Sequence, residues 1–165
     1  MAANDNIRAD RMAFYEGDVE IIDGELDGFL ELSGARAALL IDREGHLVTR
    51  RGEPIQSSVE SISALVAGSF AATREMARLL GEEEFSTMFH QGQRDNIQIS
   101  LVGDRALLSV IFDDRTNLGL VRFYAQECTR RLRDVMTEIS QREPSGPTLS
   151  ADFSSSAAAA LDELF

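Results

Sequence analysis

Residues 37–49 read AALLIDREGHLVT and carry the clearest structural signal in the chain. The first part, 37–42, is a short apolar run that suits a buried strand, and 47–49 resumes with strand-forming residues. Between them Gly45 can supply the positive φ that a short turn with a bulge requires. The stretch therefore predicts a β-hairpin.

Helical patterns lie on both sides of this hairpin. Apolar residues recur every three or four positions over residues 19–30, and Gly34 is well placed to end that helix. On the other side, Ser57 and Glu60 are spaced like a capping box and open a long central helix that runs to Gly81.

The rest of the folded region predicts three strands and a last helix. The strands are 85–90, 97–102 and 106–112, and the helix runs from about residue 117 to a point before Pro144. The order is helix, two strands, helix, three strands, helix. This order predicts an α/β (α+β) fold, with a five-stranded, mainly antiparallel sheet, helices on both faces and 85–90 at one edge.

The pattern divides the chain into a domain with shorter segments at its ends. We expect a mobile leader over 1–12, a domain over 13–141 and a Ser, Pro and Gly-rich linker over 142–156. Residues 157–165 predict a short C-terminal interaction helix with one apolar face. That face consists of Leu161, Leu164 and Phe165. The alternative is a tail that docks on its own domain or frays.

Composition and charge exclude several classes of function. The net charge of −12 opposes binding to nucleic acid or to anionic membranes, which depends on clustered basic residues. All 16 basic residues are arginine, so no lysine-dependent phosphate loop or Schiff base can form. Without a signal-peptide pattern or a membrane-length apolar run, we expect a cytoplasmic protein that does not insert into membranes.

The central helix presents two unlike faces. At 100° per residue, the larger apolar residues gather on one side and small residues on the other. The predicted core side holds Val59, Ile62, Val66, Phe70 and Leu80. The predicted outer side holds Ala64, Ala67, Gly68, Ala71 and Glu75, with Ala72 at its margin. A glycine inside a helix costs about 1 kcal/mol relative to alanine, so we expect another backbone to approach Gly68 closely. The alternative is alanine that simply faces solvent.

No group of residues predicts a catalytic or metal centre. Neither His46 nor His90 has a second histidine or cysteine at metal-ligand spacing, so we expect no metal and no cofactor. Asp113 and Asp114 fit a turn before the last helix better than an acid/base pair. Cys128 falls on an apolar helix face, which favours packing over a catalytic thiol.

Three stretches together resemble the Roadblock, or dynein light-chain, domain family over about residues 14–141. They are the hairpin LLIDREGHLV, the central helix from Leu65 to Gly81, and the closing strand and helix. Within that family, LVAGSFAATREMARLLGEEEF and VIFDDRTNLGLVRF look like the MglB group, bacterial regulators of the Ras-like GTPase MglA. The terminal LDELF is also similar to the short C-terminal helix of that group.

This resemblance implies a homodimer that binds one small Ras-like GTPase and stimulates its GTP hydrolysis by repositioning the GTPase's own catalytic residues. The two sheets would join at the third strand, where the candidate dimerisation residues are Phe85, Thr87, Met88 and Phe89. The two central helices would form the platform, with Ala64, Ala67, Gly68, Ala71, Ala72 and Glu75 as partner-binding residues. Leu161, Leu164 and Phe165 would be a tethered second contact that affects nucleotide exchange, and assembly beyond the dimer is open. The alternative is a passive scaffold that binds without changing hydrolysis.

Overall fold

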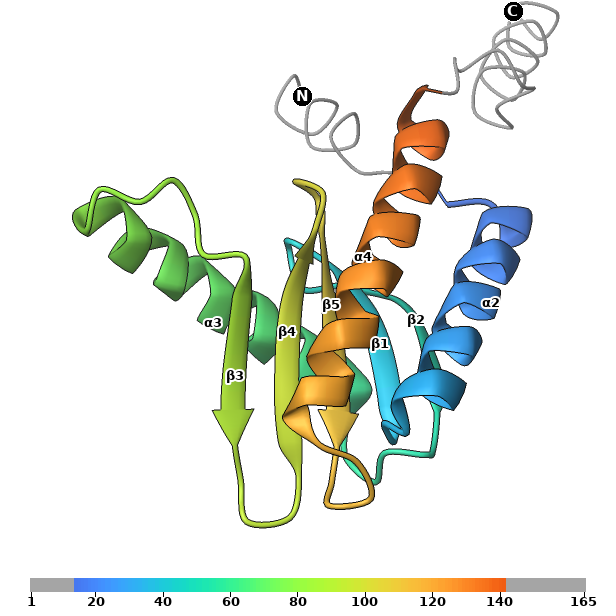
Figure 1. The fold of residues 1–165 in the computed structure, drawn as a ribbon. Coiled ribbons are helices and arrows are strands. Elements are labelled where there is room, and N and C mark those ends of the chain that lie inside the picture. Colours follow the sequence, from blue (N-terminus) through green and yellow to red (C-terminus); the bar gives the residue numbers. More distant parts are fainter. Residues whose placement is uncertain (1–13, 142–165) are drawn as a thin grey trace, which may run out of the picture. The chain divides into compact units, whose positions relative to one another are not determined.

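Five antiparallel strands form one sheet in the order β2-β1-β5-β4-β3 (Figure 1). The strands are β1 (Ala37–Asp42), β2 (Leu47–Gly52), β3 (Thr87–Gln91), β4 (Asn96–Val102) and β5 (Ala106–Phe112). The computed structural model describes residues 14–141. Residues 14–136 form one compact unit, and 137–141 are the last turn of the final helix.

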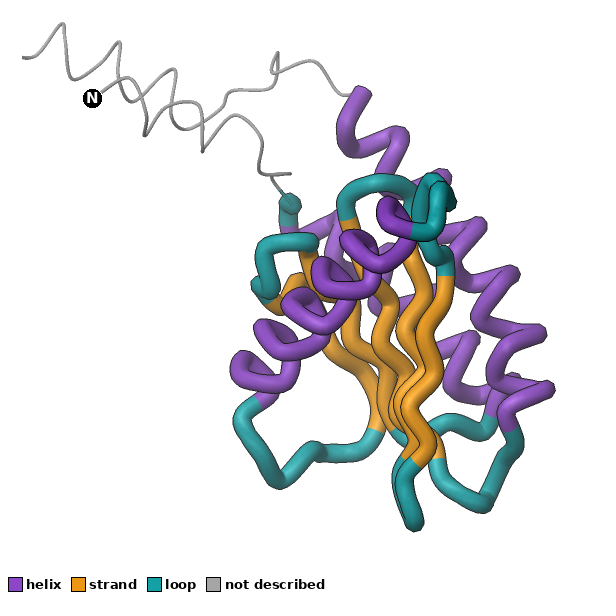
Figure 2. Tube along the Cα trace, turned by 90° about the vertical axis from the view of Figure 1, so that its left-hand side faces the viewer, coloured by secondary structure: helices purple, strands orange, loops and turns teal. Residues whose placement is uncertain are grey.

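Three helices cover the two faces of this sheet. Helix α3 (Val59–Leu79) lies on one face, and α2 (Glu16–Ser33) and α4 (Leu118–Gln141) lie on the other. Figure 2 shows the sheet from the side, between its two helical layers. The element order and the antiparallel five-stranded sheet predicted from the sequence are confirmed.

The hairpin predicted over residues 37–49 is present, with β1 paired to both β2 and β5. Gly45 has a φ of 95° at its tip. The Asp42 carboxylate closes the turn by accepting the backbone N–H groups of Glu44 at 3.0 Å and His46 at 2.8 Å. A carboxylate that satisfies two turn amides is a local reason for this sequence to reverse here.

The core sits on both faces of two inner strands, β1 and β5. Every residue of β5 and all of β1 except Asp42 are buried, as expected for strands covered on both sides. Toward α3 the side chains alternate along the strands and meet Val66 and Phe70. That core cluster includes Leu39, Ile41, Ile99, Leu107 and Ile111.

The outer strand β2 is tied to α2 by charged groups. The Arg51 guanidinium donates to both oxygens of Asp27 at 2.8 Å, and the Thr49 hydroxyl donates to Asp23 at 2.6 Å. The arginine at this pair lowers the pKa of Asp27 through a direct hydrogen bond. The β2 edge of the sheet therefore carries an arginine, Arg51, whose charge is paired within the domain.

Several predicted boundaries shift by one or two residues. Ser58, not Ser57, caps α3, because its hydroxyl accepts the Ser61 backbone N–H at 3.2 Å. Strand β3 covers 87–91 and not 85–90, although its pairing with β4 already begins where Leu101 donates to the Ser86 carbonyl. Gly34 ends α2 in the left-handed conformation, as predicted.

Three predicted segments lie outside the described residues: the leader over 1–12, the linker over 142–156 and the terminal helix over 157–165. Within residues 14–141, no helix is long and apolar enough to cross a membrane.

Candidate protein-interaction site

Helix α3 is held by caps at both ends. The Ser58 hydroxyl accepts a backbone N–H of the first turn. Glu60 places a negative charge in that turn, which stabilises the helix by interacting with its dipole. At the other end Gly81 has a φ of 78°, and the Glu82 N–H returns to the Ala77 carbonyl at 2.9 Å. These caps fix where the exposed face of α3 begins and ends.

Two residues contradict the predicted assignment of the faces of α3, and Ser63 and Ala77 are buried although neither was predicted in the core. Ala67, predicted on the outer face, is buried, whereas Leu80, predicted in the core, is 73% exposed. Leu80 lies after the last helical residue, so the periodicity of the helix no longer applies to it. The buried residues within the helix are Ser63, Val66, Ala67, Phe70 and Ala77.

The hairpin tip explains part of the small-residue face. A Cβ at Gly45 would lie 2.9 Å from the Cα of Ala64 and 3.5 Å from the Cβ of Ala67. The β1–β2 turn therefore packs directly on the first part of this face, which requires small residues on both sides. Close approach of a backbone, predicted at Gly68, occurs at Ala64 and Ala67 within the same chain.

Gly68 itself remains without such a neighbour in the described part of the chain. No heavy atom lies within 4 Å of the place where its Cβ would be, and the residue is exposed. Its own domain therefore offers no packing reason for a glycine that costs a helix about 1 kcal/mol. Close approach of a partner at Gly68 stays a prediction.

The exposed face of α3 is more apolar than the sequence analysis anticipated. Ala64, Ala71, Ala72 and Glu75 are all exposed, as expected for an outer face. Large apolar residues that the prediction missed stand beside them. We define the apolar stripe of α3 as Leu65, Gly68, Ala72, Met76 and Leu79, of which Leu65 is 71% and Leu79 81% exposed.

The spacing of this stripe could have revealed it. Its members follow one another at three or four residues, the spacing of neighbours on one side of a helix. Large exposed apolar residues in a row are typical of a surface that contacts another molecule. The stripe is thus the strongest candidate contact surface on this face of the sheet.

Charges border the stripe. Glu75, whose charge departed from the small-residue pattern, pairs with Arg78 one turn later at 2.9 Å. Arg74 lies 3.7 Å from Glu84, which also contacts Arg43 of the hairpin. Most of these side chains are well exposed, so the pairs add little to stability but frame an apolar centre with a polar rim.

The edge strand β3 pairs with β4 on one side, and no strand lies on its other side among residues 14–141. Since the Ser86 carbonyl points toward β4, alternation turns the backbone groups of Thr87, Phe89 and Gln91 to the open edge. An edge with unpaired backbone groups can accept a strand from another chain.

The predicted dimerisation side chains are not equally available. Met88 faces the α3 layer, where its sulfur accepts the Thr73 hydroxyl at 3.4 Å. Phe89 stacks on Phe112 with ring centroids 6.1 Å apart. Thr87 is exposed, and Phe85 precedes the strand. The accessible feature of β3 is therefore its backbone edge more than its side chains.

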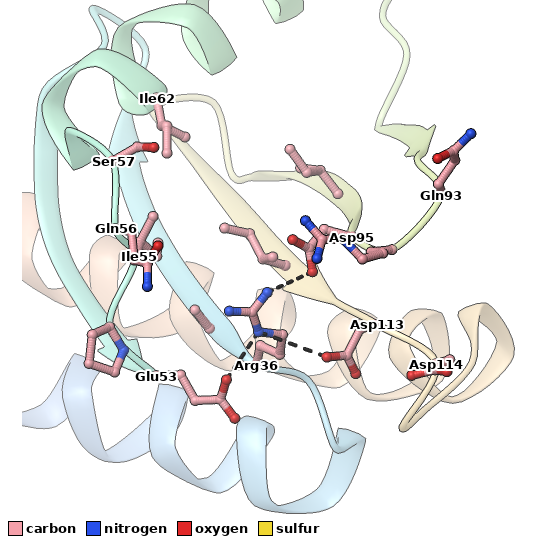
Figure 3. Close-up of a pocket in the computed structure, with 15 residues that line it drawn as sticks. Arg36, Glu53, Ile55, Gln56, Ser57, Ile62, Gln93, Asp95, Asp113 and Asp114 are labelled. Carbon is pink, nitrogen blue, oxygen red and sulfur yellow. Dashed lines mark hydrogen bonds and ion pairs between the residues drawn. The ribbon is translucent and has the colours of Figure 1, made fainter.

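A network of ion pairs joins four loops at one end of the sheet (Figure 3). Arg36 lies at its centre, 2.6 Å from Asp95, 3.0 Å from Glu53 and 3.9 Å from Asp113. Arg115 reaches Glu53 at 2.7 Å and Asp113 at 3.0 Å. Arg36 and its three acidic partners line a groove of about 840 Å³, together with isoleucines such as Ile62 and Ile111. No sequence pattern predicted this network.

The positive and negative charges of the network pair with one another. Hydrogen bonds from Arg115 and Arg36 lower the pKa of Glu53, and those from Arg115 lower the pKa of Asp113. Carboxylates held ionised by two arginines are poor acids and bases near neutral pH. The arrangement joins loops and supplies no catalytic pair.

The turn predicted at Asp113 and Asp114 is confirmed. The Thr116 N–H donates to the Asp113 carbonyl at 3.2 Å, and the Asn117 side chain accepts the Leu120 N–H at 3.0 Å. Asn117 therefore caps α4, as its residue type favours.

Cys128 is 4% exposed on the inner side of α4. Its burial raises the pKa of the thiol to about 12. A thiol that stays protonated is a poor nucleophile, so the packing interpretation of Cys128 is supported by the geometry.

One group of possible metal ligands occurs within residues 14–141. Oxygens of Asp42 and Glu44 and a ring nitrogen of His46 lie within 4.8 Å of one another at the hairpin tip. The Asp42 carboxylate is already engaged by two turn amides, and His46 and Glu44 are exposed. The absence of a metal and of a cofactor stays a prediction. Leu161, Leu164 and Phe165 lie outside the described residues.

Comparisons with known proteins identify a matching domain family and similar solved structures. The model of the Roadblock/LC7 domain family matches residues 22–112. MglB in a tetrameric arrangement is 32% identical with a TM-score of 0.74, over 78% of this chain and 96% of that one. The gliding protein MglB from Thermus thermophilus is 33% identical with a TM-score of 0.73, over 77% and 96%.

A third structure, MglB from Myxococcus xanthus, is 34% identical with a TM-score of 0.68, over 71% of this chain and 95% of that one. A comparison with curated proteins gave no match. The resemblance to MglB predicted from the sequence is confirmed.

Proposed function

The chain belongs to the Roadblock/LC7 domain family, and on that premise we propose that it is a homodimeric regulator of a small Ras-like GTPase. The family is regulatory and not catalytic. In this proposal the protein binds a GTPase of the MglA type and stimulates GTP hydrolysis without supplying a catalytic residue.

The apolar stripe of α3 is the observation that carries the proposal. Leu65, Met76 and Leu79 are exposed in a row, with Gly68 and Ala72 between them. Small residues between large ones let a partner surface approach the helix backbone while the large residues fill its hollows. A charged rim around the stripe adds specificity for one orientation.

The open edge of β3 supports the dimer. Two copies related by a twofold axis would pair β3 with β3 and extend the sheet across both domains. In such a dimer, both copies would carry α3 on the same face of the joined sheet. The two α3 helices would then lie side by side, and their stripes would form one platform. One GTPase would bind both copies.

In this proposal the chemistry belongs to the GTPase. Asp113 is held in ion pairs and the Cys128 thiol is buried, which supports a binding role for this chain. A platform that binds the GTPase more tightly in its hydrolysis-competent conformation shifts it toward that conformation. For comparison, an arginine finger that completes a GTPase active site is worth about 10³ to 10⁵ in rate.

The terminal peptide is proposed as a second contact. Leu161, Leu164 and Phe165 would form the apolar anchor, and residues 142–156 the tether. A tethered contact gains affinity from its effective concentration once the platform is bound. Through this contact the protein would also affect nucleotide exchange.

A passive scaffold is the second candidate function. It would use the same stripe and the same β3 edge, and it would bind the GTPase or another protein without changing hydrolysis. The two candidates differ in one measurable quantity, the rate of phosphate release.

Phosphate release from a GTP-loaded MglA-type GTPase tests the proposal. We expect the purified chain to accelerate release and Ala71→Arg to abolish the acceleration, because a long cation on the outer face of α3 blocks docking. Gln126→Arg introduces the same side chain on exposed α4 and should leave the rate unchanged.

The same assay separates the alternatives. Binding without acceleration would establish the scaffold, and full acceleration by Ala71→Arg would exclude the platform. Truncation after Glu143 should weaken binding or alter exchange while some acceleration persists. A truncated chain that behaves like the full one would remove the tail from the mechanism.

A further inference from the structure

The face of the sheet opposite α3 has a groove of its own. Helices α2 and α4 lie next to each other there (Figure 1) and enclose a shallow space of about 100 Å³. Phe29 and Cys128 are its buried members, and Gly28, Leu32 and Tyr124 line its walls. The proposed GTPase contacts on α3 lie on the other face of the sheet.

Large apolar side chains gather at this groove and remain exposed. Leu32 is 62% and Phe123 66% exposed, and Leu120 lies one turn before Phe123 on α4. The Phe123 ring meets Tyr124 edge to face, with centroids 5.1 Å apart and planes at 85°. We define the α2–α4 surface as Ile21, Gly24, Gly28, Leu32, Leu120, Phe123 and Tyr124. Contiguous exposed apolar residues of this size mark contact sites.

Glycines on α2 make the same surface unusually flat. Gly17, Gly24 and Gly28 are spaced by seven and four residues, so they fall on one side of the helix. No described heavy atom lies within 4 Å of a Cβ built at any of them. The packing of residues 14–136 therefore gives no reason for these glycines, although glycine disfavours a helix interior. They leave room for another helix to approach the backbone of α2.

The charge of this face selects the kind of partner. Helix α2 holds seven acidic residues and no basic one. On α4, Arg131 forms ion pairs with Glu127 at 3.1 Å and with Glu25 of α2 at 3.6 Å. Glu20 and Glu31 are exposed along α2. Two copies of this face would bring acidic helices together, which electrostatics opposes, whereas a basic partner would be attracted.

We propose that the α2–α4 surface binds an amphipathic helix of a partner protein, with arginine or lysine beside the apolar residues of that helix. The helix would lie along the groove, with its apolar side against Leu32 and Phe123 and its backbone close to Gly24 and Gly28. Its basic residues would face the acids of α2. This is a helix-in-groove contact, separate from the GTPase platform on the other face.

Two synthetic peptides of about five helical turns test the proposal with the full-length chain labelled with ¹⁵N. Both have leucines at helical spacing; one carries arginine and the other glutamate at the polar positions. The arginine peptide should shift the amide signals of Ile21, Gly24, Gly28, Leu32 and Phe123. Its affinity should fall with added salt, because the attraction is between partly exposed charges. The glutamate peptide should bind at least about tenfold more weakly.

Two variants separate binding from folding. The double variant Gly24→Ala, Gly28→Ala should raise the melting temperature, because alanine favours a helix and its Cβ has room at both positions. It should nevertheless lower the affinity for the arginine peptide at least about tenfold. Phe123→Asp should also weaken it to that extent. Leu79→Asp makes a similar change at an exposed residue of α3 and should leave peptide affinity unchanged.

Other results would overturn the proposal. Equal affinity for the two peptides would mean that binding is hydrophobic and that charge does not contribute. Amide shifts centred on α3 would place the binding site on the other face. Unchanged affinity in the double alanine variant would show that no backbone approaches α2. Self-association that Phe123→Asp abolishes would assign the surface to a second copy. Stimulation of the GTPase should be unaffected by Phe123→Asp, so either proposal can fail without the other.

Discussion

Gly45 at the hairpin tip lies directly against Ala64 of α3: a Cβ at Gly45 would come within 2.9 Å of the Ala64 Cα. The turn and the helix are thus fitted backbone to backbone, 19 positions apart in the sequence. This contact fixes the start of α3 on the sheet, and with it the direction in which the apolar stripe points.

Gly45→Ala should destabilise the domain by about 2 to 3 kcal/mol, since alanine would meet both a positive φ and a backbone atom. Urea unfolding followed by circular dichroism measures the change. Gly81→Ala is the matched control, because Gly81 also has a positive φ but open space around it, so it should lose only about 1 kcal/mol. Equal losses would show that the contact with Ala64 is unimportant.

Leu65→Gln with Leu79→Gln should weaken GTPase binding at least about tenfold, because both are large, exposed apolar residues of the proposed platform. Folding stability should change by no more than about 0.5 kcal/mol per substitution, as both residues are largely exposed. Isothermal titration and thermal melting check the two expectations. Leu120→Gln, an exposed leucine on the other face, should bind the GTPase normally.

Thr87→Pro should shift the protein from dimer to monomer in light scattering. Thr87 is exposed, and its N–H points to the open edge of β3, so proline removes a bond that only a partner strand would use. Thr87→Ala keeps that N–H and should remain dimeric. A dimer that survives Thr87→Pro would mean that the sheets do not join at β3.

Arg115→Met should make stability less dependent on pH in the acidic range. Arg115 lowers the pKa of Glu53 and of Asp113 in the folded protein. Carboxylates with a lowered folded pKa stabilise fully above their ordinary values, 4.5 and 3.8, and lose this effect as the pH falls through the lower folded values. The variant should therefore be less stable at neutral pH, and the difference should shrink on acidification.

Urea midpoints between pH 7 and pH 3 measure that difference. Arg122→Met, which removes an exposed arginine from α4, is the control and should give a pH profile parallel to that of the unmodified chain. A constant gap between Arg115→Met and the unmodified chain at every pH would contradict the role of the ion pairs.

Cys128 should resist alkylation by iodoacetamide at pH 8 in the folded protein. With the pKa raised to about 12, the thiolate fraction is about 10³-fold below that of an ordinary thiol. Mass spectrometry should find rapid modification only in denaturant. Fast reaction of the native protein would mean that α4 exposes the residue frequently.

Local patterns predicted the elements well because each depends on neighbours in the sequence. The apolar run of β1, the glycine of its turn and the periodicity of α4 needed no distant contact to be recognised. Even the Cys128 environment followed from its position on a helix face.

Long-range packing accounts for what the sequence could not show. Ala67 belongs to the core cluster with Val66 and Phe70 and also meets the hairpin tip, and the second contact cannot be read from the sequence of α3 alone. Arg36 finds Glu53, Asp95 and Asp113 only after four loops have come together. The apolar stripe differs, since the helical spacing of Leu65, Met76 and Leu79 is visible in the sequence, whereas their exposure is known only from the structure.

The two edges of the sheet are unlike, and this asymmetry limits growth. On β2, Arg51 is paired with Asp27, and Arg50 donates to the Glu53 carbonyl at 2.6 Å, so charged side chains stand along that border. An arriving strand would have to displace them, whereas β3 offers bare backbone. In the proposed dimer, where β3 pairs with β3, each copy has used its open edge. Strand addition is then self-limiting at two chains, which protects a protein with an exposed edge from polymerising into fibres.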